Sequence, residues 1–192
     1  MGKNRTKAAD LSADAVVERA KSMANDWMWA VSLQHDRIVN PRPQDKPFHP
    51  FGMLDFNEAD VHFLTIALRR PRQTAATIEH APQQWDPVRR AIETFDAKLP
   101  WLKLLRDVFE HLEDYAVDSN RRHSSTSRRE LQVWSGGNEG LDWLGYDVDW
   151  REAHLAAKDL YASVKAAYDS MSAQARQKDR HLQEGEPDKE SG

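Results

Sequence analysis

The sequence predicts an all-α protein, a bundle of four long helices and one short helix. Two observations favour this fold class. Apolar residues recur at helical spacing in five segments, and residue types that begin helices precede several of them. In addition, only Leu131 to Trp134 resembles a strand, and a single strand of that length is not stable alone.

The first helix is expected to begin after Ser12, a residue type that caps helix amino termini, and to reach about Ile38. Its apolar face is formed by Val16, Ala20, Met23, Trp27 and Val31. A loop from Asn40 to Phe56 follows, with four prolines and several aromatic residues. Because a loop of this length is uncommon in a compact domain, we expect it to pack against the bundle as a lid.

The second helix is expected after Asn57, with its buried face formed by Val61, Leu64 and Leu68. Pro71 should interrupt it, so that the chain kinks or restarts before the segment from Thr74 to His80. The third, shorter helix should begin at Asp86-Pro87, where aspartate would cap the helix and proline would take its first position.

The fourth helix is expected from Pro100 to about Val117, and the fifth from Asp149, with an apolar stripe that reaches Met171. Residues 177–192 carry five acidic against three basic residues and almost nothing apolar, so they cannot offset their ordering entropy. We therefore expect a flexible amino terminus over 1–11, a helical bundle over 12–176 and a disordered acidic tail over 177–192.

The overall composition excludes several classes of protein. A net charge of -4 argues against a protein that coats DNA, which would be strongly basic. The absence of cysteine excludes a disulfide framework, a cysteine zinc site and a thiol nucleophile. The mean hydropathy is -0.79, with no apolar run of membrane-spanning length and no apolar export signal. We expect a soluble, cytoplasmic protein with no membrane association.

The candidate chemistry lies on the fourth expected helix. On an ideal helix, Arg106 and His111 lie on opposite margins of the apolar arc, about 140° apart and ~7.5 Å along the axis. Asp107 precedes His111 by four residues, so its carboxylate can hold the imidazole, and Arg106 has the same spacing to Glu110.

The segment Arg106-Asp107-Val108-Phe109-Glu110-His111 resembles the R-X4-6-H motif of the HEPN superfamily, whose polar residue after the arginine is here Asp107. Tyr115 extends the similar run. The resemblance implies an all-α bundle and a metal-independent endoribonuclease without cofactors, with Arg106 and His111 as catalytic residues. It also implies a homodimer, found in toxin–antitoxin or phage-defence systems, whose partner would be an antitoxin or another defence protein.

The chemistry of RNA cleavage suits these residue types. A base must remove the proton of the 2′-hydroxyl, and histidine has the side-chain pKa closest to neutrality. A cation must stabilise the charged phosphorane, and the guanidinium fork matches phosphate oxygens. One arginine and one histidine form a sparse site, which pairing across a two-fold axis would complete.

A basic run follows the motif. Residues 119–129 hold four arginines and no acidic residue, and we expect sequence-independent phosphate contacts from Arg121, Arg122, Arg128 and Arg129. The same run could also be a solvated loop. Trp85, Trp134, Trp143 and Trp150 are expected in the core, with base stacking as their alternative role.

Three alternatives stay open from the sequence. His111 could be a structural histidine, in a HEPN-like fold without activity or in an unrelated helical bundle. His62, His111 and His154, on three helices, could together bind a metal. The chain could also be a helical interaction module that binds a protein partner or a nucleotide.

Overall fold

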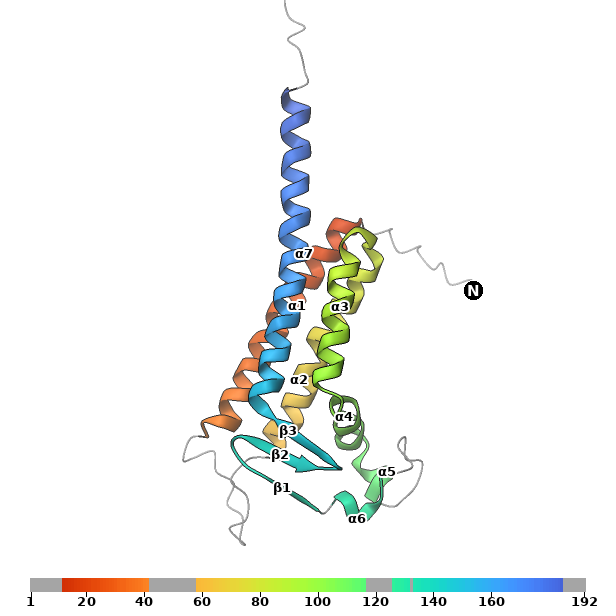
Figure 1. Ribbon diagram of the computed structural model, residues 1–192, viewed down its shortest axis with the longest axis vertical. Helices are drawn as coiled ribbons and strands as arrows, with labels where there is room; N and C mark the ends of the chain where they lie inside the picture. The colour runs from red at the N-terminus through yellow and green to blue at the C-terminus, as the bar shows by residue number, and fades with distance from the viewer. Residues whose placement is uncertain (1–11, 42–57, 117–125, 132, 185–192) are drawn as a thin grey trace, which may run out of the picture.

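The computed structural model describes residues 12–41, 58–116, 126–131 and 133–184, and it is mostly helical (Figure 1). Helix α2 (Glu58–Ala76) packs against α1 (Ala13–Val39), α3 (Pro82–Lys98) and α7 (Trp150–Glu184). Helices α1 and α3 both contact α7 as well. These four helices form one bundle with a continuous apolar core. The prediction of a mainly helical protein is thereby confirmed.

The first helix has the predicted bounds, but its buried face is rotated from the predicted one: Ala20 and Val31 are buried, Val16 and Trp27 are only partly buried, and Met23 is 38% exposed. The Ser12 Oγ accepts a hydrogen bond from the Ala15 N–H at 3.2 Å, so Ser12 is the expected cap. The helix ends at Val39, and its buried face is formed by Val17, Ala20, Ala24, Met28, Val31 and Ile38. Both the expected flexible segment 1–11 and most of the expected lid lie outside the described residues.

The restart of the helix that Pro71 could cause is not observed. Helix α2 continues through Pro71 to Ala76, and the short 3-10 helix η2 (Thr77–His80) follows. Proline removes one backbone hydrogen bond, but Pro71 is buried together with Leu68 and Ala75. Burial of these side chains offsets the missing bond, so the helix continues through Pro71.

The expected start of the third helix is also wrong. Helix α3 begins at Pro82, which takes the first helical position, where the missing N–H of proline costs no hydrogen bond. Pro87 therefore lies inside the helix and Asp86 does not cap it. Two prolines in one segment each fit a helix start, and the structure uses the earlier one.

A three-stranded antiparallel sheet, which the sequence did not predict, precedes α7. Its strands are β1 (Trp134–Gly136), β2 (Gly140–Trp143) and β3 (Tyr146–Asp149), in that order. Leu144 and Gly145 turn the chain between β2 and β3 with φ angles of 54° and 79°, as in a tight two-residue hairpin. The strands are too short to be stable alone, and the burial of Leu141, Trp143 and Val148 against the helices stabilises them.

Helix α7 begins where predicted and ends later. The Asp149 Oδ1 accepts the backbone N–H groups of Arg151 and Glu152, at 2.7 and 2.9 Å, so Asp149 is the expected cap. The helix continues to Glu184 and projects beyond the other helices (Figure 1). The expected disorder is therefore wrong for residues 177–184, which are helical. A helix that is packed over its first part can extend through residues of high helix propensity that make no core contacts. Residues 185–192 lie outside the description.

No helix in the described segments is both long enough and apolar enough to cross a membrane. That finding agrees with the low mean hydropathy of the chain.

Two histidines join α1 to α7. The imidazoles of His35 and His154 stack with ring centroids 4.4 Å apart, and the Ser32 Oγ lies 3.1 Å from the His154 Nε2. Burial lowers the pKa of His35, and burial and then the neighbouring His35 lower the pKa of His154. The folded protein therefore favours both rings in their neutral form.

We expect acid to destabilise the protein through this pair. Both pKa values lie below the ordinary 6.5 in the folded state, so the unfolded chain binds protons first as the pH falls. The stability that the neutral pair contributes is complete above pH 6.5 and is lost progressively as the pH falls below that value. Urea unfolding at several pH values below 6.5 should show that His154→Gln reduces the loss of stability with falling pH. His80→Gln changes a side chain that is 70% exposed and should leave that loss unchanged. Equal slopes in both variants would contradict the assignment.

A second prediction concerns the sheet. A Cβ atom at Gly140 would lie 2.4 Å from the carbonyl oxygen of Val148, whereas one at Gly137 would meet nothing within 4 Å. Gly140→Ala should therefore lower the free energy of unfolding by about 1–3 kcal/mol. Gly137→Ala is the matched control and should change it by no more than about 0.5 kcal/mol in the same denaturation experiment.

Candidate functional site

The motif helix is shorter than expected and breaks at the candidate histidine. Helix α4 (Leu102–Glu110) ends with His111 as its C-cap, at φ -134° and ψ 36°, and the short helix α5 (Leu112–Ala116) follows. The expected continuous helix from Pro100 to Val117 is therefore wrong. The break turns the chain at His111, so its position cannot be taken from ideal helix geometry.

Arg106 is held by two carboxylates on its own helix. Its guanidinium forms an ion pair with the adjacent Asp107 and a 2.9 Å hydrogen bond from Nη1 to the Glu110 Oε2. The side chains of Arg106 and Asp107 are 16% and 3% exposed, so this ion pair is largely shielded from water. The predicted spacing of Arg106 and Glu110 is thereby confirmed as a contact.

The expected pairing of Asp107 with His111 is not observed. Asp107 faces Arg106 instead, and among the described residues no hydrogen bond or ion pair joins Asp107 to His111. A buried carboxylate is stabilised most by a fully charged partner, and arginine keeps its charge where histidine does not. His111 itself is partly exposed.

The remaining predicted site residues divide into three groups. Tyr115 is fully buried and belongs to the core, which removes it from the surface of the site. Arg129 is exposed on the short helix α6 (Arg128–Leu131), and the structure describes the backbone of Arg128 but not its side chain. Arg121 and Arg122 lie outside the described residues.

The tryptophans are mostly structural. Trp143 and Trp150 are buried in the core, as expected, and the indole Nε1 of Trp150 donates a hydrogen bond to the Gly137 carbonyl. Trp85 and Trp134 are partly buried against the same core.

Two residues of α2 reach the motif helix, a contact that the sequence analysis did not predict. The His62 ring stacks on Phe109 at a centroid distance of 4.9 Å, and Phe109 in turn contacts Trp143. Arg69 lies close enough to α4 for the charge of Arg106 to lower its pKa, after the larger effect of burial. His62 and Arg69 are seven residues apart, so they share one face of α2, and this spacing was the available signal.

The structure separates the three histidines of the metal alternative. His62 stacks on Phe109, His154 stacks on His35, and His111 caps α4. Within the described ranges, no group of three or more His, Cys, Asp or Glu side chains is placed to hold a metal ion. The geometry thus gives no support to a site built from these three residues.

We expect the Arg106–Asp107 pair to contribute to stability. Asp107→Asn removes the charge that faces Arg106 in a shielded position, and should lower the free energy of unfolding by about 2 kcal/mol. Glu110→Gln is the matched control, because the Glu110 side chain is 38% exposed, and should cost less than about 1 kcal/mol. Chemical denaturation measures both, and equal losses would contradict the shielded pair.

Comparisons with protein-family models, with curated proteins and with solved structures found no match to this chain. Arg106 lies within α4, and His111 follows at the C-cap of the same helix, five residues further along the chain.

Proposed function

We propose that this chain is a metal-independent endoribonuclease of the HEPN type, with Arg106 and His111 as its catalytic residues. The observation that carries the proposal is the fixed arginine beside a helix break. Two carboxylates hold Arg106 in one orientation, and His111 lies at the carboxyl end of the same helix with a partly exposed side chain.

The two residues would divide the chemistry of transesterification. The imidazole of His111 removes the proton of the 2′-hydroxyl, whose oxygen attacks the adjacent phosphorus and expels the 5′-oxygen of the next nucleotide. The guanidinium of Arg106 stabilises the extra negative charge on the phosphorane oxygens. An orientation fixed beforehand by Asp107 and Glu110 lowers the reorganisation that the transition state requires.

A homodimer would complete the site. One histidine cannot act as base and acid in the same step, because the departing 5′-oxygen needs a proton while the base is taking one up. Two chains related by a two-fold axis supply two histidines and two arginines. A ribonuclease of this kind would serve as the toxin or effector of a toxin–antitoxin or phage-defence system, with an antitoxin or defence protein as its partner.

A second candidate function is a non-catalytic module that binds a protein partner or a nucleotide. Two observations favour it. The carboxylates of Asp107 and Glu110 offset the charge of Arg106, which weakens phosphate binding by that residue alone. Trp29 is 69% exposed and Leu33, one turn further along α1, is 40% exposed, which are side chains typical of protein interfaces.

The deciding experiment is cleavage of a labelled single-stranded RNA by the purified protein in the presence of EDTA. His111→Ala should lower the cleavage rate by about 10²–10⁴-fold, the usual effect of losing a general acid or base. Arg106→Ala should lower it comparably, and the double variant should be little worse than either, because the two residues act together.

His80→Ala is the matched control, since His80 is exposed on η2, and should retain the wild-type rate. Circular dichroism must show each variant folded. Wild-type protein that cleaves no RNA, alone or freed from a partner, would favour the interaction module, and loss of cleavage on chelation would contradict the metal-independent mechanism.

A further inference from the structure

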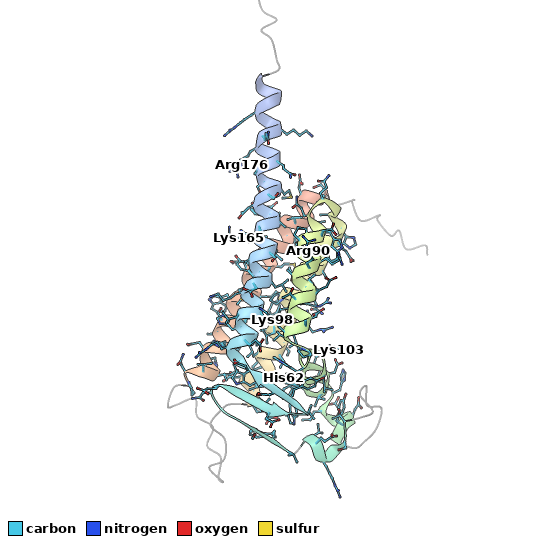
Figure 2. All side chains as sticks on the ribbon, in the orientation of Figure 1. His62, Arg90, Lys98, Lys103, Lys165 and Arg176 are labelled. Carbon is cyan, nitrogen blue, oxygen red and sulfur yellow. The ribbon has the colours of Figure 1, made fainter. Side chains whose placement is uncertain are left out.

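A basic cleft lies beside the motif helix. It has a volume of about 400 Å³ and is formed by α2, the carboxyl end of α3 and the first turn of α4. Its charged residues are Arg69, Arg72, Asp96 and Lys103. Lys103 lies at the end of the bundle opposite the protruding part of α7 that carries Arg176 (Figure 2).

One pair of charges in this cleft is already compensated. The Arg72 guanidinium donates from Nε and Nη2 to the two carboxylate oxygens of Asp96, at 3.0 and 2.8 Å. These hydrogen bonds raise the pKa of Arg72. The pair therefore contributes little net charge, and the cleft's positive charge comes from the two other cations.

Arg69 has no counter-charge of its own in the described part of the chain. It forms no ion pair there, and its buried Nε has no hydrogen-bond partner. The nearby carboxylates of Asp107 and Glu110 are both paired with Arg106, itself a second cation beside Arg69. A partly desolvated guanidinium next to another guanidinium is costly, and a bound anion would remove that cost.

Lys103 extends the positive surface towards the candidate site. It precedes Arg106 by three residues on α4, so the two lie on one face of the helix, ~4.5 Å apart along its axis. Lys103 is exposed and forms no ion pair with any described residue. Arg69 from α2 and Lys103 from α4 thus place two cations without ion pairs to described residues in one cleft, with Arg106 near Arg69.

We propose that this cleft binds backbone phosphates of the RNA strand that reaches Arg106, with Arg69 and Lys103 as the phosphate ligands. The proposal rests on the proposed ribonuclease function and names how that site holds its substrate. The described lining of the cleft includes leucine and proline but no aromatic ring for base stacking. The cleft should therefore bind the phosphate backbone without selecting a base sequence. An acidic protein segment is the competing occupant, and the experiment separates the two.

The test measures the affinity of His111→Ala protein for a labelled single-stranded RNA by fluorescence anisotropy at several salt concentrations. Adding Arg69→Gln and Lys103→Gln should weaken binding by about tenfold or more, because hydrogen bonds from charged donors are lost. The slope of log affinity against log salt should fall by about 0.7 for each phosphate contact removed. RNAs of different sequence should lose affinity equally.

The matched control is the pair Arg176→Gln and Lys178→Gln, which removes the same two residue types from the exposed end of α7. It should leave both affinity and slope unchanged. If Arg69→Gln protein does not fold, Lys103→Glu at the exposed position carries the same expectation. Two results would overturn the proposal. One is a variant with Arg69→Gln and Lys103→Gln that binds RNA with wild-type affinity and salt slope. The other is a cleft that binds a polyglutamate peptide and not RNA.

The outcomes for the two proposals are distinguishable. If the wild-type chain cleaves RNA and the Arg69 and Lys103 variants cleave it with unchanged KM, the cleft is wrong and the ribonuclease stands. If the wild-type chain cleaves nothing but binds RNA in a manner that depends on Arg69 and Lys103, the cleft stands and the ribonuclease is wrong.

Discussion

The shielding of the Arg106 guanidinium from water is the constraint on which this site depends. Arginine keeps its charge, so at 16% exposure it requires a counter-charge within direct contact. Asp107 supplies it from the adjacent position and Glu110 from one turn further on. All three residues are on one short helix. Arg106 therefore needs no counter-charge from another element when α4 packs against α2.

The same pairing decides the roles of the neighbouring residues. Asp107 pairs with Arg106, and among the described residues it makes no hydrogen bond or ion pair with His111, which lies at the helix break. Both carboxylates offset charge that would otherwise attract phosphate. The charge of Arg106 is thus largely compensated within the motif, and Arg69 of α2 is the further cation that the fold brings beside it. The charges of the motif and the charge of Arg69 in the cleft thus act on one another.

The sheet gives the motif helix its second support. Phe109 lies between His62 of α2 and Trp143 of β2, so one aromatic cluster joins the end of α4 to the bundle and to the sheet. The hairpin turn at Leu144 and Gly145 returns the chain to β3 and from there to the Asp149 cap of α7. The short strands therefore connect the motif to the longest helix through packed side chains.

The sequence by itself determined the features that depend on neighbouring residues. Ser12 and Asp149 cap helices because their side-chain oxygens reach backbone N–H groups two or three residues ahead. The apolar stripe of α7 follows from helical periodicity, and the contact of Arg106 with Glu110 follows from their spacing. Each of these requires no knowledge of what lies across the core.

Only the tertiary structure decided the rest. Pro71 remains inside a helix because its surroundings bury it, and three short strands persist because Leu141, Trp143 and Val148 pack into the core. Arg69 lies near Arg106 because α2 packs against α4, a contact between residues far apart in the chain. In each case the free energy comes from burial or charge between distant segments, which local propensity does not contain.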